Sequence, residues 1–197
     1  MTIISGPEVG LAGHFKIEAH RVDAEGVEVP GSRRVLADWF PNLITNNGLD
    51  MLAEKTFMDF IQVGSGTATP TFGDTALASR VAGVARQSVD QGTPGAGNVY
   101  SSVTGTYVFA QGAAAGNLAE IGAAPAATGP VFSRARILDG GGNPTTITVT
   151  AIDILTVTYE LRLYIDQSDV AGSMTISGVT YNTVSRPCLM NAKKAKN

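Results

Sequence analysis

Apolar and polar residues alternate along the start of the chain, which is the pattern of a half-buried strand. Over residues 14–23, Phe15, Ile17 and Ala19 fall on one face of an extended chain, and polar side chains alternate with them. Residues 27–39 continue with spaced valines and predict a second strand, bent where a Pro-Gly pair interrupts it. The two strands together predict an antiparallel hairpin.

One short helix is predicted over residues 45–55. Thr45, Asn46 or Asn47 can cap it, because each offers a side-chain oxygen to the first free backbone N–H groups. Apolar residues then recur at helical spacing, and Lys55 suits the C-terminal end of the helix dipole. Because the helix is short, we expect it to depend on packing against the rest of the protein.

Short apolar runs separated by turn-forming residues predict strands through the remainder of the chain. The stretch 64–76 is rich in Gly, Thr and Pro and predicts a loop, with one helical turn starting at Asp74. The predicted strands cover residues 57–63, 80–89, 98–110, 117–122, 131–138, 145–165 (two strands or one with a bulge), 173–181 and 184–190.

This spacing of strands predicts a mainly β fold, an antiparallel β-sandwich or barrel-like domain with one short helix and an N-terminal hairpin. We divide the chain into a hairpin or arm at 1–40, a β-sandwich domain at 41–190 and a basic tail at 191–197.

Composition excludes some classes of partner. Charged residues are 16% of the chain, below the ~25% of typical soluble domains. A surface of Ala, Gly, Thr and Ser suits a protein that packs against neighbours, and it also suits any β protein with many turns.

The net charge is −3, and the basic residues cluster only at Lys193, Lys194 and Lys196, so we expect no nucleic-acid partner. The first residues of the sequence lack the basic and apolar segments of a signal peptide, and no apolar run of about 18 residues occurs, so we expect neither a signal peptide nor a membrane partner.

Residues able to do chemistry are few and scattered. Cys188 is the single cysteine and lies among apolar residues, which is typical of a buried inert thiol. His14 and His20 are too far apart on a strand to share a metal, and we expect them to be exposed. Asp166 and Asp169 suit a turn better than a cation site. The sequence therefore predicts no enzymatic activity, no metal and no other cofactor.

Glu120 is the carboxylate whose surroundings are hardest to interpret, because it stands in the apolar run Leu-Ala-Glu-Ile. It lies either on an outward face or beside a basic residue of the next strand, for which Arg134 and Arg136 are the candidates. We favour the exposed placement.

Three groups of short segments carry a resemblance that spans residues 40–182. They lie at 42–50, 63–70 and 74–77, then at 117–122 and 131–136, and finally at 156–165 and 169–176. In this order they resemble a group of tail and fibre-associated structural proteins of tailed bacteriophages. The single motifs are rich in Gly, Thr and Ala, and only the ordered set is informative.

The resemblance implies an oligomeric, non-enzymatic virion protein, associated with the tail and assembled in the host cytoplasm. Its place would be the neck or collar, the tail tip, the baseplate or the root of a fibre, and the short chain favours a connector or fibre-anchoring role. Its partners would be copies of itself, in a trimer or ring, and other tail, neck or fibre proteins. Strand edges, the N-terminal hairpin and the loop 64–79 would provide the contact surfaces. The residues expected to carry structure or interaction are Asn42, Thr45, Gly48, Gly64, Gly66, Asp74, Glu120, Arg134 and Arg136.

Two other functions remain open at this point. A receptor- or carbohydrate-binding module of a tail fibre predicts a pocket at loop tips that includes Tyr100, Tyr107 or Tyr181. A small β-sandwich hydrolase predicts a cleft with two perturbed carboxylates or a His-assisted nucleophile.

Overall fold

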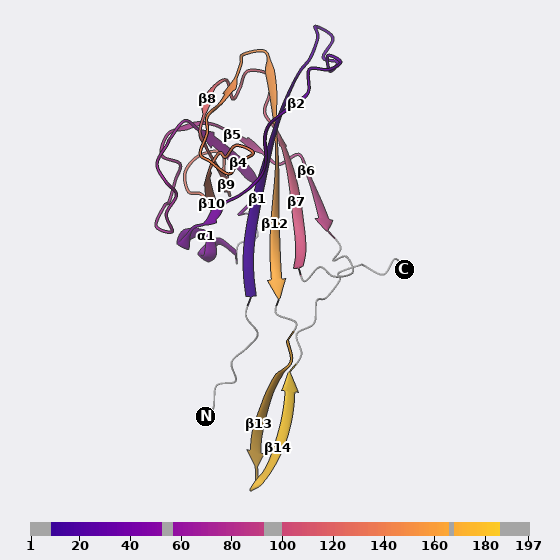
Figure 1. The fold of residues 1–197 in the computed structure, drawn as a ribbon, viewed down its shortest axis with the longest axis vertical. Helices are drawn as coiled ribbons and strands as arrows, with labels where there is room; N and C mark the ends of the chain where they lie inside the picture. The colour runs from indigo at the N-terminus through magenta and orange to yellow at the C-terminus, as the bar shows by residue number, and fades with distance from the viewer. Residues whose placement is uncertain (1–8, 53–56, 93–99, 166–167, 186–197) are drawn as a thin grey trace.

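A computed structural model describes residues 9–52, 57–92, 100–165 and 168–185, and in this part of the chain the protein is mainly β (Figure 1). Two five-stranded antiparallel sheets pack face to face, and a pair of short strands lies beside them. A fourth unit, the two-stranded hairpin β13–β14, stands apart from the two sheets. The predicted β-sandwich with one short helix is confirmed.

The first sheet has the strand order β2-β1-β12-β7-β6. The predicted N-terminal hairpin is its β1–β2 part, but it is not a separate arm, because β1 pairs along its whole length with β12. The second strand also begins later than predicted, after a loop at 22–33. The bounds in this sheet are β1 (Val9–Arg21), β2 (Arg34–Pro41), β6 (Ser88–Gly92), β7 (Tyr100–Val108) and β12 (Asp153–Ile165).

The second sheet has the order β3-β10-β9-β4-β5, and the helix α1 lies against it. The capping prediction for the helix is confirmed at Thr45, whose side chain accepts a hydrogen bond from the backbone of Gly48. The bounds are β3 (Leu43–Ile44), α1 (Asn46–Met51), β4 (Phe60–Gly64), β5 (Arg80–Ala85), β9 (Glu120–Ala124) and β10 (Ser133–Arg136). The remaining elements are β8 (Gly116–Leu118), β11 (Ile147–Val149), β13 (Val170–Ile176) and β14 (Val179–Ser185).

Several predicted strands are divided in the structure. Residues 80–89 form the end strand of one sheet and then the edge of the other, because the chain crosses between the layers at Arg86. Residues 145–165 form two strands, the first of the alternatives above. The prediction of one strand over 173–181 is wrong, because Ser177 and Gly178 turn the chain back with positive φ angles of 50° and 82°.

One further prediction is wrong, and another falls partly outside the described residues. No helical turn starts at Asp74, which instead ends a hydrogen-bonded turn that begins at Thr71. The end of the predicted strand 184–190, together with Cys188 and the three C-terminal lysines, lies outside the described residues.

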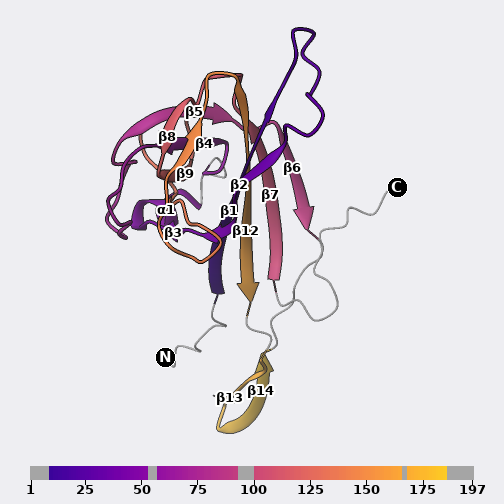
Figure 2. The ribbon, with the colours of Figure 1, turned by 45° about the horizontal axis from the view of Figure 1, so that its top comes forward.

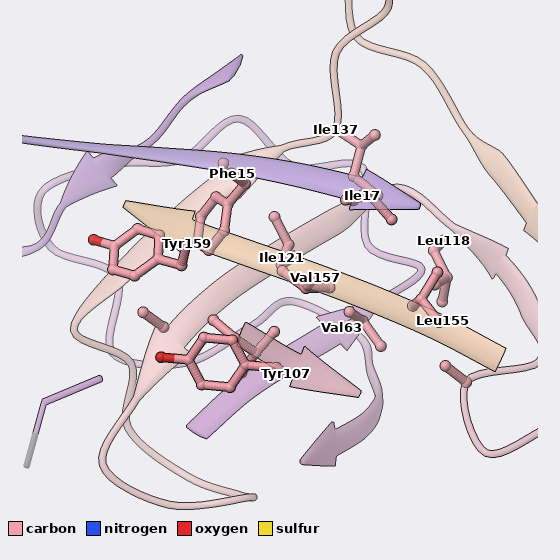
Figure 3. Packing of buried hydrophobic residues seen from close by; sticks show 14 of the residues in the cluster. Phe15, Ile17, Val63, Tyr107, Leu118, Ile121, Ile137, Leu155, Val157 and Tyr159 are labelled. Carbon is pink, nitrogen blue, oxygen red and sulfur yellow. The ribbon is translucent and has the colours of Figure 1, made fainter. Parts of the chain in front are cut away.

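The core fills the space between the two sheets (Figure 3). From the first sheet, Phe15, Ile17 and Tyr159 point inward, and Val63 and Ile121 meet them from the second. All five side chains have no exposed surface. The inward face of β1 is therefore the one that the alternation in the sequence predicted. No residue of this core comes from β13 or β14.

The molecule is elongated, with different features at its two ends (Figures 1 and 2). The loop at 22–33 projects from one end. At the other end β1 begins, β12 stops, and the hairpin β13–β14 extends away from the sheets. We call this second end the hairpin end.

Candidate functional site

Most of the predicted site residues surround one loop, residues 65–79, which connects β4 to β5. Sequence reasoning placed these residues in three separate segments, and the sheet brings them together because β4 and β10 flank β9 on its two sides. The residues are Gly64, Gly66, Asp74, Glu120, Arg134 and Arg136.

Glu120 is fully buried, so the expectation of an exposed side chain is wrong and the paired alternative holds. Its Oε1 accepts hydrogen bonds from the backbone N–H groups of Gly66 (3.1 Å) and Ser79 (2.6 Å). Its Oε2 accepts from the N–H of Ala78 (3.0 Å) and from Nε of Arg134 (2.9 Å). Each carboxylate oxygen is thus satisfied by at least two donors, as a buried charge requires.

The guanidinium of Arg134 extends the network from Glu120 to the middle of the loop. Its Nη1 lies 2.5 Å from Oδ2 of Asp74, and its Nη2 donates to the carbonyl of Ala68 at 3.0 Å. Burial opposes ionisation of Asp74, but hydrogen bonds from Thr71 and Arg134 hold the pKa of this carboxyl below its ordinary value. Arg136, the other candidate partner of Glu120, donates instead to the loop carbonyl of Thr67.

Two glycines give Glu120 the room it needs. A Cβ added at Gly66 would lie 2.3 Å from Oε1 of Glu120, and one added at Gly64 would lie 2.7 Å from the same atom. These positions are therefore small because a carboxylate fills the adjoining space. Neither glycine has a positive φ angle, so these positions require space and not a left-handed backbone.

Of the other three predicted residues, Thr45 and Gly48 fix the start of the helix, and Asn42 bonds to β12. The Thr45 hydroxyl lies 3.2 Å from the backbone carbonyl of Phe132, and the Thr45 N–H donates to the same carbonyl at 3.1 Å. Gly48 packs so closely on the backbone just before β10 that an added Cβ would lie 1.9 Å from the Phe132 oxygen. Asn42 donates to the buried hydroxyl of Tyr159 at 3.0 Å.

Sequence reasoning missed one comparable cluster, centred on Asp153 at the start of β12. Its carboxylate receives hydrogen bonds from both Nη atoms of Arg34 (3.1 and 2.8 Å), from Nε of Arg21 and from the N–H and hydroxyl of Thr150. The guanidinium of Arg34 holds the pKa of Asp153 far below its usual range, against the opposing effect of burial. The pair of residues three apart, Thr150 and Asp153, was the available sequence signal, typical of a local side-chain turn.

These polar clusters hold elements together, and their groups are already bonded. Glu120, Arg134 and Asp153 are buried and fully engaged by neighbours within the fold. Among the described residues, no group of three or more His, Cys, Asp or Glu side chains is arranged to hold a metal ion. These clusters therefore support a structural role, in which buried side chains hold backbone segments in place.

The histidines and tyrosines discussed above are distributed over the molecule. His14 and His20 are both half-buried, not exposed as expected. Burial together with the nearby Arg162 lowers the pKa of His14. Tyr107 lies in the core, whereas Tyr100 packs on Tyr164 and Tyr181 lies on the hairpin. The three tyrosines proposed for a receptor pocket therefore do not share one.

Two apolar hollows open near the hairpin end, on either side of Leu11. One, of about 330 Å³, is bordered by the exposed rings and chains of Phe72 and Leu49. The other, of about 380 Å³, lies over the ends of the first sheet. Among the described residues, the first is lined by Leu11, Asn42, Leu43, Ile44, Leu49 and Phe72, and the second by Leu11, Leu52, Phe57, Ser101, Val103, Leu161 and Leu163.

The hairpin adds a third apolar surface at the same end. Its cross-strand pairs Met174–Tyr181 and Ile176–Val179 lie on one face, because residues directly opposite each other share a face and faces alternate along a strand. All four side chains are 44–56% exposed.

Comparison with protein-family models, curated proteins and solved structures found no match to this chain. Across the described residues, the structure holds no helix of the length and apolar character that crossing a membrane requires.

Proposed function

We propose that this protein is a non-enzymatic structural component of a tailed-phage virion, in the neck or collar, tail tip, baseplate or fibre attachment. It works by assembling with copies of itself and with other virion proteins. The ordered segments over residues 40–182 support the phage assignment, through their resemblance to tail and fibre-associated proteins.

The observation that carries an assembly role is that two hollows and the apolar face of the hairpin lie at the same end of the molecule. Large exposed apolar patches on a folded protein mark interaction sites, because leaving them in water is unfavourable. Here the hollows and the hairpin lie at one end. The second hollow is almost entirely apolar, whereas the first is mixed, with more apolar than polar surface. This is the surface that a neighbouring protein in a particle would cover.

The buried polar clusters support the same role. Glu120 and Arg134 bind loop 65–79 at several backbone positions, which keeps Phe72 in place beside the first hollow. A loop that is fixed before contact loses less conformational entropy when a partner binds. The network therefore presents a rigid contact surface.

The proposal is tested on virions of the phage that encodes the chain. Purified particles are analysed by mass spectrometry for this protein and labelled with gold-coupled antibodies against it in the electron microscope. We expect the protein in amounts comparable to known tail proteins, and gold at the tail or neck. Absence from particles that contain all other tail proteins, or label only on the head, would overturn the proposal.

A further inference from the structure

The hairpin β13–β14 has one apolar face and one mainly polar face. Met174, Ile176, Val179 and Tyr181 form the outer two pairs of the apolar face. The opposite face carries Ser173, Thr175, Thr180 and Asn182, with Ala171 and Val184 nearer the sheets. A hairpin in which both faces met water would not require this division.

An isolated two-stranded hairpin is at most marginally stable in water, and it gains stability when a further layer covers an apolar face. The sandwich does not supply that layer, since no hairpin residue belongs to its core and the hairpin extends away from it (Figures 1 and 2). Within the part of the chain that the structure describes, no layer covers this face.

The charge of the hairpin indicates which surface this is. Residues 170–185 contain no Asp, Glu, Lys, Arg or His. A face that meets an identical face brings each of its charges close to the same charge, so self-contact is favourable only where the face is uncharged. A strongly charged partner would gain nothing from this surface.

The hollows of the sandwich fit the hairpin less well than a second hairpin does. An engineered cavity of about 150 Å³ takes up one benzene molecule, so each of the two separate hollows, of about 330 and 380 Å³, takes only about two large side chains. The apolar face offers four such side chains. A second hairpin of equal length covers all of them at the ~10 Å spacing of packed sheets.

We propose that the apolar face of β13–β14 packs against the same face of the hairpin in a second copy of this chain. This inference rests on the proposed function, since it names the first partner of an assembly protein. A contact of this face with the same face of a second copy is isologous, so two copies close into a two-layer structure with twofold symmetry.

The test measures the mass of the full-length protein by light scattering over a range of concentrations. We expect the wild-type chain to associate, Met174→Lys to be monomeric, and the control Asn182→Lys, on the polar face, to associate like the wild type. A wild-type monomer at all concentrations would overturn the inference, and so would association of Met174→Lys.

Mixing variants tests whether the two hairpins meet. Met174→Lys and Met174→Glu are each expected to be monomeric, and an equimolar mixture is expected to regain the wild-type mass, because opposite charges then face each other. This rescue also shows that both variants are folded. A mixture that stays monomeric would overturn hairpin-to-hairpin contact and direct attention to the hollows.

These outcomes are separate from those of the proposed function. A chain that is monomeric in solution but present at the phage tail would overturn this inference alone. A chain that associates through its hairpin but is absent from virions would overturn the phage assignment alone.

Discussion

Glu120 holds three backbone N–H groups and one guanidinium in a position that water does not reach. Glu120→Gln keeps the size of the side chain but removes the charge that faces Arg134. It also leaves some of the N–H donors opposite an amide nitrogen. Loss of one partner of a buried ion pair typically costs about 3 kcal/mol or more. We expect the free energy of unfolding, measured in urea, to fall by about that amount.

The matched control is Glu28→Gln, which breaks the exposed pair between Glu28 and Arg33. An exposed ion pair is screened by water, and we expect this variant to unfold like the wild type. Equal stability of the Glu120 and Glu28 variants would contradict the assigned role of the buried network.

Asp153 is expected to make stability depend on pH in the acid range. Its pKa in the folded protein is held below the ordinary 3.8 by Arg34, so the unfolded chain takes up a proton first as the pH falls. The stabilisation by Asp153 is present above pH 3.8 and is lost as the pH falls below that value. We expect Asp153→Asn to lower the Tm at neutral pH.

The Tm difference between wild type and Asp153→Asn should then shrink from about pH 5 down to about pH 2, since both side chains are then neutral in the unfolded chain. Thermal unfolding followed by circular dichroism at intervals across this range measures the difference. A constant difference would show that the carboxylate charge does not carry the effect.

Single residues show how far sequence reasoning extends. It selected Glu120, Arg134 and Arg136 as related, because a carboxylate in an apolar run needs a partner on the neighbouring strand. It did not predict that Glu120 is buried, because three of its donors are backbone N–H groups from a loop more than forty residues away in the chain. The sequence does not indicate which backbone N–H groups a side chain will contact.

The helix α1 offers a test at the scale of one element. Replacing Gly by Ala inside a helix ordinarily stabilises it by about 0.5–1 kcal/mol. At Gly48 we expect the opposite, a loss of about 1–3 kcal/mol, because the new Cβ would lie 1.9 Å from the carbonyl oxygen of Phe132 and must displace β10 or the helix. Urea unfolding measures the sign.

Asp50→Ala is the control in the same helix, because Asp50 is exposed and Ala there meets solvent. It is expected to leave stability nearly unchanged. If Gly48→Ala stabilised the protein, the close packing of α1 on β10 would be refuted.

Whole elements were predicted well where local pattern decides them. The inward face of β1 follows from the alternation of apolar and polar residues. The cap of α1 follows from the hydroxyl of Thr45. Breaks between strands were predicted poorly. Residues 80–89 were predicted as one strand, but the chain passes from one sheet to the other within this segment. The turn at Ser177 and Gly178 carried a recognisable Ser-Gly pair, which the surrounding strand-forming residues outweighed.

The whole molecule is a sandwich whose class followed from strand spacing, whereas its strand order did not. The pairing of β1 with β12 joins segments at opposite ends of the chain, and only tertiary packing selects such a partner. The hollows at the hairpin end could not be predicted for the same reason, because residues from several elements on both sheets line them.

The hairpin β13–β14 is expected to be separable from the sandwich. Val170 and Ser185 are paired across the hairpin, so their Cα atoms lie about 5 Å apart and residues 170–185 can be deleted without stretching the chain. The two-sheet core contains none of these residues. We expect the deleted chain to fold and, as a monomer, to unfold in urea with nearly the wild-type midpoint.

A variant with residues 170–185 replaced by a Gly/Ser segment of equal length is the control for chain connectivity, and it should behave like the deletion. The comparison is made at concentrations low enough for the wild type to be monomeric, because association would itself raise wild-type stability. If both altered chains failed to fold, the hairpin would be part of the core of one chain. Its apolar face would then have a partner within the molecule, and the argument for contact between copies would lose its basis.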